Sequence, residues 1–201
     1  MKRIITLGAA LALLAFACED RVHAPTPTPE PTGAESPVEV LETVEKSFNE
    51  RDTKLLVSSL SENFVFYFDP DDVGQRPPGK PSYEIPESWS YTEFWNAANN
   101  MFTKAYSISL SIPTDQVGTP AENETTFRAE KISISLLVMV DELNGYIADQ
   151  GFCNFAFESY TSEAGKKCWR VTKWWDRTAV PADARLGVSP ASLGKVFALF
   201  K

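Results

Sequence analysis

The sequence predicts an α+β fold in which a strongly curved antiparallel sheet wraps around about three N-terminal helices. Two observations carry this prediction. Apolar residues recur at helical spacing near the start of the domain, and strictly alternating segments follow from residue 106 onwards. Helices that are segregated from a run of antiparallel strands are typical of the α+β class. Without residues 1–37, about 164 residues remain, which suits one domain with a hydrophobic core.

The pattern of residues 37–104 predicts three helices. The first follows the candidate cap Ser36, and its apolar positions are Val40, Leu41, Val44 and Phe48. The second is shorter, with Asp52 placed to cap it and an apolar face made by Leu55, Leu56 and Leu60. The third runs from Ser90 to about Lys104, since Ser90 and Glu93 have the capping-box spacing.

Five segments read as strands. The aromatic segment 64–68 precedes the third helix, and residues 106–112 alternate between apolar residues and serine. Residues 132–140 carry a long apolar face, and Asn144-Gly145 is a strong hairpin signal before the segment 146–159, which we expect to kink at Gly151. The last strand covers residues 167–176.

Residues 69–89 form the least regular part of the domain. Five prolines and two glycines interrupt this stretch, so we expect a long loop that holds at most one short edge strand. Asp69, Asp71 and Asp72 suggest calcium, but Lys80 stands where the helix-loop-helix calcium motif needs a glutamate. Turn formation and solvation are the simpler roles for these carboxylates.

The N-terminus resembles a bacterial lipoprotein signal. Lys2 and Arg3 precede an apolar run that is too short to span a membrane, and small residues lead to Cys18. The resemblance implies a signal peptide over residues 1–17, cleavage before Cys18 and acylation of Cys18, so that the chain is anchored to a membrane on the extracytoplasmic (periplasmic or surface) side of a bacterial cell envelope. A secretory signal cleaved after Ala15-Phe16-Ala17 and an uncleaved anchor are the alternatives.

A proline- and threonine-rich tether over residues 18–37 separates this signal from the domain. It has almost no large apolar side chains, so it is expected to be extended rather than folded. The net charge is −8, and −10 without Lys2 and Arg3, which argues against nucleic acid and anionic lipid as direct partners. Membrane attachment is therefore expected through the lipid on Cys18.

The remaining cysteines, Cys153 and Cys168, could form a disulfide in an oxidising compartment. The predicted hairpin weakens this pairing, because it places Cys153 opposite Trp174 and Cys168 opposite Ser159. No metal-ligand spacing is present, and His23, the only histidine, lies in the tether. The sequence therefore predicts no metal and no cofactor.

The order of elements resembles the nuclear transport factor 2-like superfamily, especially its SnoaL-like members. Besides the order of elements, the resemblance rests on a last strand that contains Trp169, Val171, Trp174, Trp175 and Asp176. The segments at 64–70, 99–102 and 192–196 are also similar to an uncharacterised group of bacterial lipoproteins. The resemblance covers most of residues 38–200, with the SnoaL-like domain at 38–178, and implies a cone-shaped sheet with a pocket at its open end.

That fold serves enzymes, binding proteins and association modules alike, so it does not choose among functions. Asp176 is a candidate acid or base if the neighbouring tryptophans shield it, although capping the strand or pairing with Arg170 or Arg177 is the simpler role. Aromatic side chains that could line an apolar pocket, or simply fill the core, are Tyr67, Trp89, Trp95, Tyr146 and Trp174.

The extension over residues 179–201 ends in a short amphipathic helix with apolar positions Leu193, Val196, Phe197 and Phe200. It could pack on its own domain, which we favour, or capture a partner or a second subunit. Three functions remain open at this point. They are binding of a small apolar ligand or an envelope protein without catalysis, a carboxylate-dependent SnoaL-like isomerase, dehydratase or cyclase, and a structural homodimerisation module.

Overall fold

The computed structural model describes residues 33–180 and 187–201. Its helices are α1 (Pro37–Glu50), α2 (Thr53–Ser59), α3 (Tyr91–Lys104) and α4 (Leu193–Ala198), with a 3-10 turn at Thr114–Gln116. Its strands are β1 (Leu60–Tyr67), β2 (Ser88–Ser90), β3 (Ser107–Ser111), β4 (Thr126–Ile132), β5 (Ser135–Met139), β6 (Gly145–Ala148), β7 (Gln150–Thr161), β8 (Lys167–Ala179) and β9 (Val188–Pro190). The α+β class predicted from the sequence is confirmed.

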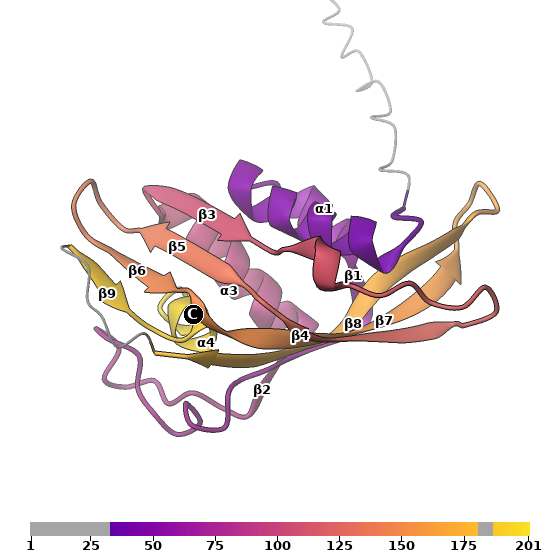
Figure 1. The fold of residues 1–201 in the computed structure, drawn as a ribbon. Helices are drawn as coiled ribbons and strands as arrows, with labels where there is room; N and C mark the ends of the chain where they lie inside the picture. Colours follow the sequence, from indigo (N-terminus) through magenta and orange to yellow (C-terminus); the bar gives the residue numbers. More distant parts are fainter. Residues whose placement is uncertain (1–32, 181–186) are drawn as a thin grey trace, which may run out of the picture. The chain divides into compact units, whose positions relative to one another are not determined.

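The strands form two sheets. One has five strands in the order β2-β1-β8-β7-β4, and the other has four in the order β3-β5-β6-β9. Figure 1 shows the long, bent strands β7 and β8 running from one sheet towards the other, with the helices gathered on one side of this curved surface. We call this side inner and the opposite side of the five-stranded sheet its outer face.

The sheet is mixed, which corrects the prediction of an antiparallel sheet. Strand β1 pairs in parallel with β8, where Phe66 lies opposite Trp174, and β6 pairs in parallel with β9. The sequence pattern of a single strand does not reveal its partner, and β1 and β8 are far apart along the chain. The local hairpins β5–β6 and β7–β8 are antiparallel, as their turn residues predict.

The three predicted helices are confirmed, except that Leu60, expected on the second helix, is the first residue of β1. Ser36 caps α1 by accepting a hydrogen bond from the amide of Glu39, and Asp52 accepts from the amide of Lys54 at the start of α2. The Glu93 carboxylate accepts from both the amide and the hydroxyl of Ser90, which fixes the start of α3. These contacts lie within four residues in the chain, so local sequence specifies them.

The strand predictions need two changes. The long strand expected at 132–140 is two strands, β4 and β5, which belong to different sheets. The expected kink at Gly151 is a change of sheet between β6 and β7, and the φ of Gly151 is +96°. A Cβ at this glycine would lie 2.4 Å from the carbonyl oxygen of Arg177, so close backbone approach as well as backbone conformation requires glycine.

The core lies between the inner side of the sheets and α1, α3 and α4. Its largest fully buried side chains are aromatic, and they come from both halves of the chain: Phe48, Phe64, Phe66, Trp89, Phe94, Phe155, Phe157, Trp174 and Phe197. At about 25 cal/mol per Å² of buried apolar surface, aromatic side chains of this size dominate the stability of such a core.

The predicted signal peptide, the acylated Cys18, His23 and the tether up to residue 32 lie outside the described residues. Within the part of the chain that the structure describes, no helix is long and apolar enough to cross a membrane. The same residues contain no group of three or more His, Cys, Asp and Glu side chains placed to hold a metal ion.

Candidate functional site

Asp176, the candidate acid or base, lies on the inner side of β8 and is fully buried. Its Oδ1 accepts hydrogen bonds from the amide of Thr178 at 2.8 Å and from the hydroxyl of Thr178 at 2.6 Å. Its Oδ2 accepts from the amide of Gly194 at 2.7 Å. Both carboxylate oxygens are therefore bonded to the chain itself, and two of the three donors belong to a single threonine.

Burial raises the pKa of the Asp176 carboxyl to about 6, because the charged form loses its hydration. The hydrogen bonds from Thr178 and Gly194 oppose this shift, and the negative charge of Asp72 adds to it. A carboxyl group with such a pKa has a value suited to general acid-base work. The surroundings of Asp176 do not match that role, because both carboxylate oxygens already accept hydrogen bonds from Thr178 or Gly194.

A second carboxylate, that of Asp72, also binds α4 to the rest of the domain. Ser192, the residue that caps α4, donates its hydroxyl to Asp72 Oδ2, and Lys195 Nζ lies 2.8 Å from Asp72 Oδ1. The amide of Leu193 donates to the hydroxyl of Thr178 at 2.7 Å. Asp72 lies in a turn, as its place in the aspartate cluster predicts, but its carboxylate is buried rather than solvated and anchors α4.

Phe197 of α4 fills the space that the predicted pocket would need. Its ring centroid lies 5.8 Å from Phe48, 5.4 Å from Phe66, 5.2 Å from Phe94 and 5.9 Å from Trp174. These are ordinary distances for edge-to-face and tilted aromatic contacts. The helix packs on its own domain, so the self-packing alternative is the observed one.

The predicted pocket aromatics do not converge on one cavity. Trp89 and Trp174 are fully buried in the core, whereas Trp95 on α3 and Tyr146 on β6 are half-buried. Tyr67 alternates with the core residues of β1 and therefore lies on the outer face, where its ring stacks on Trp175 at 5.5 Å. Of the two alternatives considered for these aromatics, lining a pocket or filling the core, Trp89 and Trp174 fill the core.

The disulfide considered from the sequence is not formed, because Cys153 and Cys168 are both free and buried. Across the hairpin, Cys153 lies opposite Asp176 and Cys168 opposite Tyr160, which also corrects the predicted register. Burial, and next the charge of Asp176, raise the pKa of the Cys153 thiol well above its usual value. Its thiolate is therefore disfavoured, and Cys153 acts as a small apolar core residue.

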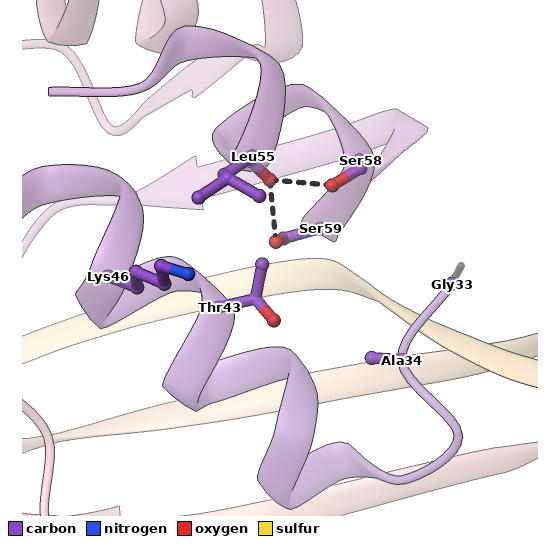
Figure 2. A pocket seen from close by; sticks show the side chains of 7 residues that line it. All are labelled: Gly33, Ala34, Thr43, Lys46, Leu55, Ser58 and Ser59. Atoms are coloured by element: carbon purple, nitrogen blue, oxygen red, sulfur yellow. Dashed lines mark hydrogen bonds between the residues drawn. The ribbon is translucent and has the colours of Figure 1, made fainter. Parts of the chain in front are cut away.

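A surface pocket of about 170 Å³ lies away from Asp176, between α1, α2 and the segment that leads into α1. Figure 2 shows its lining, and the residues are Gly33, Ala34, Thr43, Lys46, Leu55, Ser58 and Ser59. The hydroxyls of Ser58 and Ser59 both donate to the carbonyl of Leu55. Since its hydroxyl donors bond to backbone carbonyls and the Lys46 side chain is 59% exposed, the pocket offers no set of converging groups for a ligand.

Sequence reasoning found Asp176 and the amphipathic character of α4 but did not connect them. It missed Thr178 and Gly194, and it did not connect Asp72 with α4; these residues join α4 to β8 and to the long loop. The one local signal was the position of Gly194 in a helix, where glycine is unfavourable. A Cβ at Gly194 would lie 2.6 Å from Phe68 Cδ1 and 3.0 Å from Asp176 Oδ2, which explains the glycine.

These observations define an α+β protein whose curved sheet encloses a filled core, with its own α4 over the one fully buried carboxylate of β8. No protein-family model matches the chain, and no curated protein matches it in sequence. Solved structures of similar fold include a conserved protein from Planctomyces limnophilus (TM-score 0.45, 14% identity, 70% of this chain and 91% of that one).

Two further neighbours are described as NTF2-like. One is from Salmonella enterica serovar Typhimurium, with a TM-score of 0.41 and 14% identity over 75% of this chain and 92% of that one. The other is a protein of unknown function from Shewanella baltica, with a TM-score of 0.39 and 14% identity over 72% of this chain and 91% of that one. These likenesses concern the arrangement of helices and strands.

Proposed function

We propose that this chain is a lipid-anchored protein of the bacterial cell envelope that acts by binding an envelope partner through its surface, without catalysis. The observation that carries the proposal is the position of Phe197 among Phe48, Phe66, Phe94 and Trp174. A small ligand inside the sheet would have to displace this ring. Loss of a buried phenylalanine from a core costs about 3–5 kcal/mol, which a weakly bound small molecule does not supply.

The proposal that the chain acts without catalysis is supported by the environment of Asp176. A general acid or base must come within hydrogen-bond distance of the substrate atom that gains or loses the proton. Asp176 is fully buried under α4 and both of its oxygens accept hydrogen bonds from the chain, so a substrate atom would reach it only if α4 moved away. The carboxylate is better suited to orient Thr178 and the first turn of α4.

The proposed anchor rests on the sequence around Cys18 and on the position where the folded domain begins. Residues 33–36 already contact the sheet, since the amide of Trp169 donates to the carbonyl of Ala34 at 2.8 Å. The 14 residues between Cys18 and Gly33 contain four prolines and few apolar side chains. Such a segment suits a spacer between an acylated cysteine and a folded domain.

Labelling with an alkyne analogue of palmitate in a bacterial host tests the anchor. We expect label on the wild-type chain and on Cys168→Ser, and none on Cys18→Ser, with the protein in the membrane fraction only when label is present. Label on all three chains, or on none, would contradict the proposal. The Cys168→Ser variant is a matched control because it removes one thiol and leaves the N-terminus unchanged.

Native mass spectrometry of the chain purified from its own host tests the binding mode. We expect the folded chain without a retained small apolar molecule. A stoichiometric adduct that disappears when α4 is perturbed would instead support ligand binding inside the sheet. The same spectrum reports a homodimer, the remaining alternative, as a species of twice the mass.

A further inference from the structure

The outer face of the five-stranded sheet carries an unusual concentration of positive charge for an acidic chain. Strand β8 contributes Arg170 and Lys173, whose ladder partners on β7 are Glu158 and Ala156. Arg128 on β4 pairs with the same Ala156, so its side chain points to the same face as Lys173. The chain has 27 acidic and 19 basic residues, so carboxylates are available in excess for every cation.

These cations are held by aromatic rings instead of carboxylates. The Arg128 guanidinium lies 5.0 Å and Lys173 Nζ lies 5.9 Å from the ring centroid of Trp175, and Arg170 lies 3.8 Å from that of Tyr160. Within the described residues, neither Arg128 nor Lys173 forms an ion pair. Cation–π contacts orient a charge without neutralising it, so the positive charge remains available to a partner.

Two carboxylates, Glu158 and Glu130, lie near the three cations Arg128, Arg170 and Lys173. Glu158 lies opposite Arg170, and its carboxylate accepts a hydrogen bond from Ser61 at 2.5 Å. Glu130 is exposed at the irregular end of β4. Charges farther away than about 10 Å are largely screened at ordinary salt concentrations, so the net charge of −8 does not decide what binds to this face.

Aromatic side chains add an amphipathic component to this face. Tyr67 stacks on Trp175 with an angle of 12° between the rings, and both side chains are half-exposed. Tyrosine and tryptophan are enriched where proteins meet the headgroup region of a bilayer, because their rings combine an apolar body with a polar edge. Lysine and arginine beside them attract anionic headgroups.

The chain enters the domain at the edge of the sheet, beside the first residues of β8. The Sγ of Cys168 donates to the carbonyl of Gly33 at 3.3 Å, and by strand alternation Cys168 shares the outer face with Arg170, two residues further along β8. The 14 residues between Cys18 and Gly33 span at most about 50 Å when fully extended. An acylated Cys18 would therefore keep the domain near the membrane and raise the effective concentration of its surface there.

We propose that the outer face around Arg128, Lys173 and Trp175 docks on the anionic lipid headgroups of the membrane that carries the anchor. The inference rests on the proposed lipid anchor for its location, but the headgroup contact is a property of the folded domain alone. It reverses the expectation from net charge, because the cations are gathered on one face. Acyl anchors commonly need such a second contact for stable attachment.

Vesicle co-sedimentation of the mature chain, residues 18–201 carrying Cys18→Ser, tests this contact without any acyl group or signal peptide. Vesicles consist of phosphatidylcholine alone, or of equal parts phosphatidylcholine and phosphatidylglycerol. We expect binding to the anionic vesicles only, and weaker binding as salt is raised. Each cation near an anionic surface contributes about fivefold in affinity, so Arg128→Gln with Lys173→Gln should weaken binding by more than tenfold.

The matched control is Lys46→Gln with Lys54→Gln, which removes the same charge from α1 and α2 and should change binding by less than about threefold, because these cations lie away from the outer face. Equal binding to both vesicle types, no binding, or an equal loss in the control pair would overturn the proposal. Binding to soluble polyglutamate without binding to anionic vesicles would also overturn it and indicate an acidic protein partner. Since Cys18 is replaced, failure of the acylation experiment and failure of this one are independent.

Discussion

The amide of Gly194 donates a 2.7 Å hydrogen bond to Oδ2 of Asp176, which joins the first turn of α4 to the central strand β8. This bond links Asp176, the candidate acid or base, to α4, the helix that covers it. The two neighbouring bonds, from Leu193 to Thr178 and from Ser192 to Asp72, repeat the arrangement on either side. Asp176 and α4 therefore form one structural unit, and the following predictions test it.

Substitution of Gly194 by alanine should destabilise the domain. The added Cβ would lie 2.6 Å from Phe68 Cδ1, so either the ring or α4 must shift. We expect the free energy of unfolding in urea to fall by about 1–3 kcal/mol, as for other overpacked sites. Gly118→Ala is the control, because its nearest neighbour is Phe127 Cζ at 3.5 Å, and it should change stability by less than about 0.5 kcal/mol. Equal effects of the two substitutions would contradict the tight contact at Gly194.

Phe197→Ala should cost about 3–5 kcal/mol of unfolding free energy, because it removes a fully buried ring that touches four others. Leu143→Ala is a suitable comparison, since Leu143 is 76% exposed and its truncation should change stability by less than about 0.5 kcal/mol. Thermal or urea unfolding followed by circular dichroism measures both. A cost near zero for Phe197→Ala would mean that α4 does not belong to the folded core in solution.

The raised pKa of Asp176 makes stability depend on pH. The folded domain binds this proton up to about pH 6, whereas an unfolded aspartate releases it near 3.8. The contribution of Asp176 to stability is therefore greatest below pH 3.8 and is lost as the pH rises through about 6, at up to about 1.4 kcal/mol per pH unit.

Asp176→Asn isolates this contribution, because an amide does not titrate. The difference in unfolding free energy between the wild-type chain and the variant should fall from pH 4 to pH 6 and stay level above that. The difference is the useful quantity, since Glu93 has a lowered pKa and contributes with the opposite sign. A flat difference over this window would indicate a solvated Asp176.

Thiol reactivity tests the state of Cys153 and Cys168. In the Cys18→Ser chain, a thiol reagent such as dithiobisnitrobenzoate should react slowly with the native protein, because both thiols are buried. After unfolding without reductant, it should react with both thiols, because both are free. The high pKa of Cys153 should make it the slower of the two to react in the native state. Absence of thiol in the unfolded, unreduced chain would show that a disulfide forms.

The sequence was sufficient wherever a feature depends on near neighbours. The capping of α3 by Ser90 and Glu93, the cap at Ser36 and the turn at Asn144-Gly145 are all local, and the structure contains each of them. Residue periodicity also placed the core face of α1 correctly. Such features need only the rules of helix ends and hairpins.

What sequence reasoning missed depends on residues that are distant in the chain. The parallel pairing of β1 with β8 and the bond between Asp176 and Gly194 leave no periodic pattern. The sequence could not show which face of β1 carries Tyr67. Every residue from Phe64 to Phe68 is apolar or aromatic, so this segment has no polar positions that would mark the outer face. The net charge of the chain did not predict the cations on the outer face, because a sum over all residues does not record where the charged side chains lie.

The pairing of Val65 with Lys173 joins residues more than a hundred positions apart. Long-range strand pairing slows folding, because the entropy of closing a large loop is lost before the contacts form. One edge of the aromatic strand β1 therefore stays unpaired until the ribosome has synthesised β8 and β8 has left the exit tunnel. A nascent or translocating chain would expose a strongly aggregation-prone segment during that interval, so efficient production of this protein should depend on chaperones that shield residues 60–67.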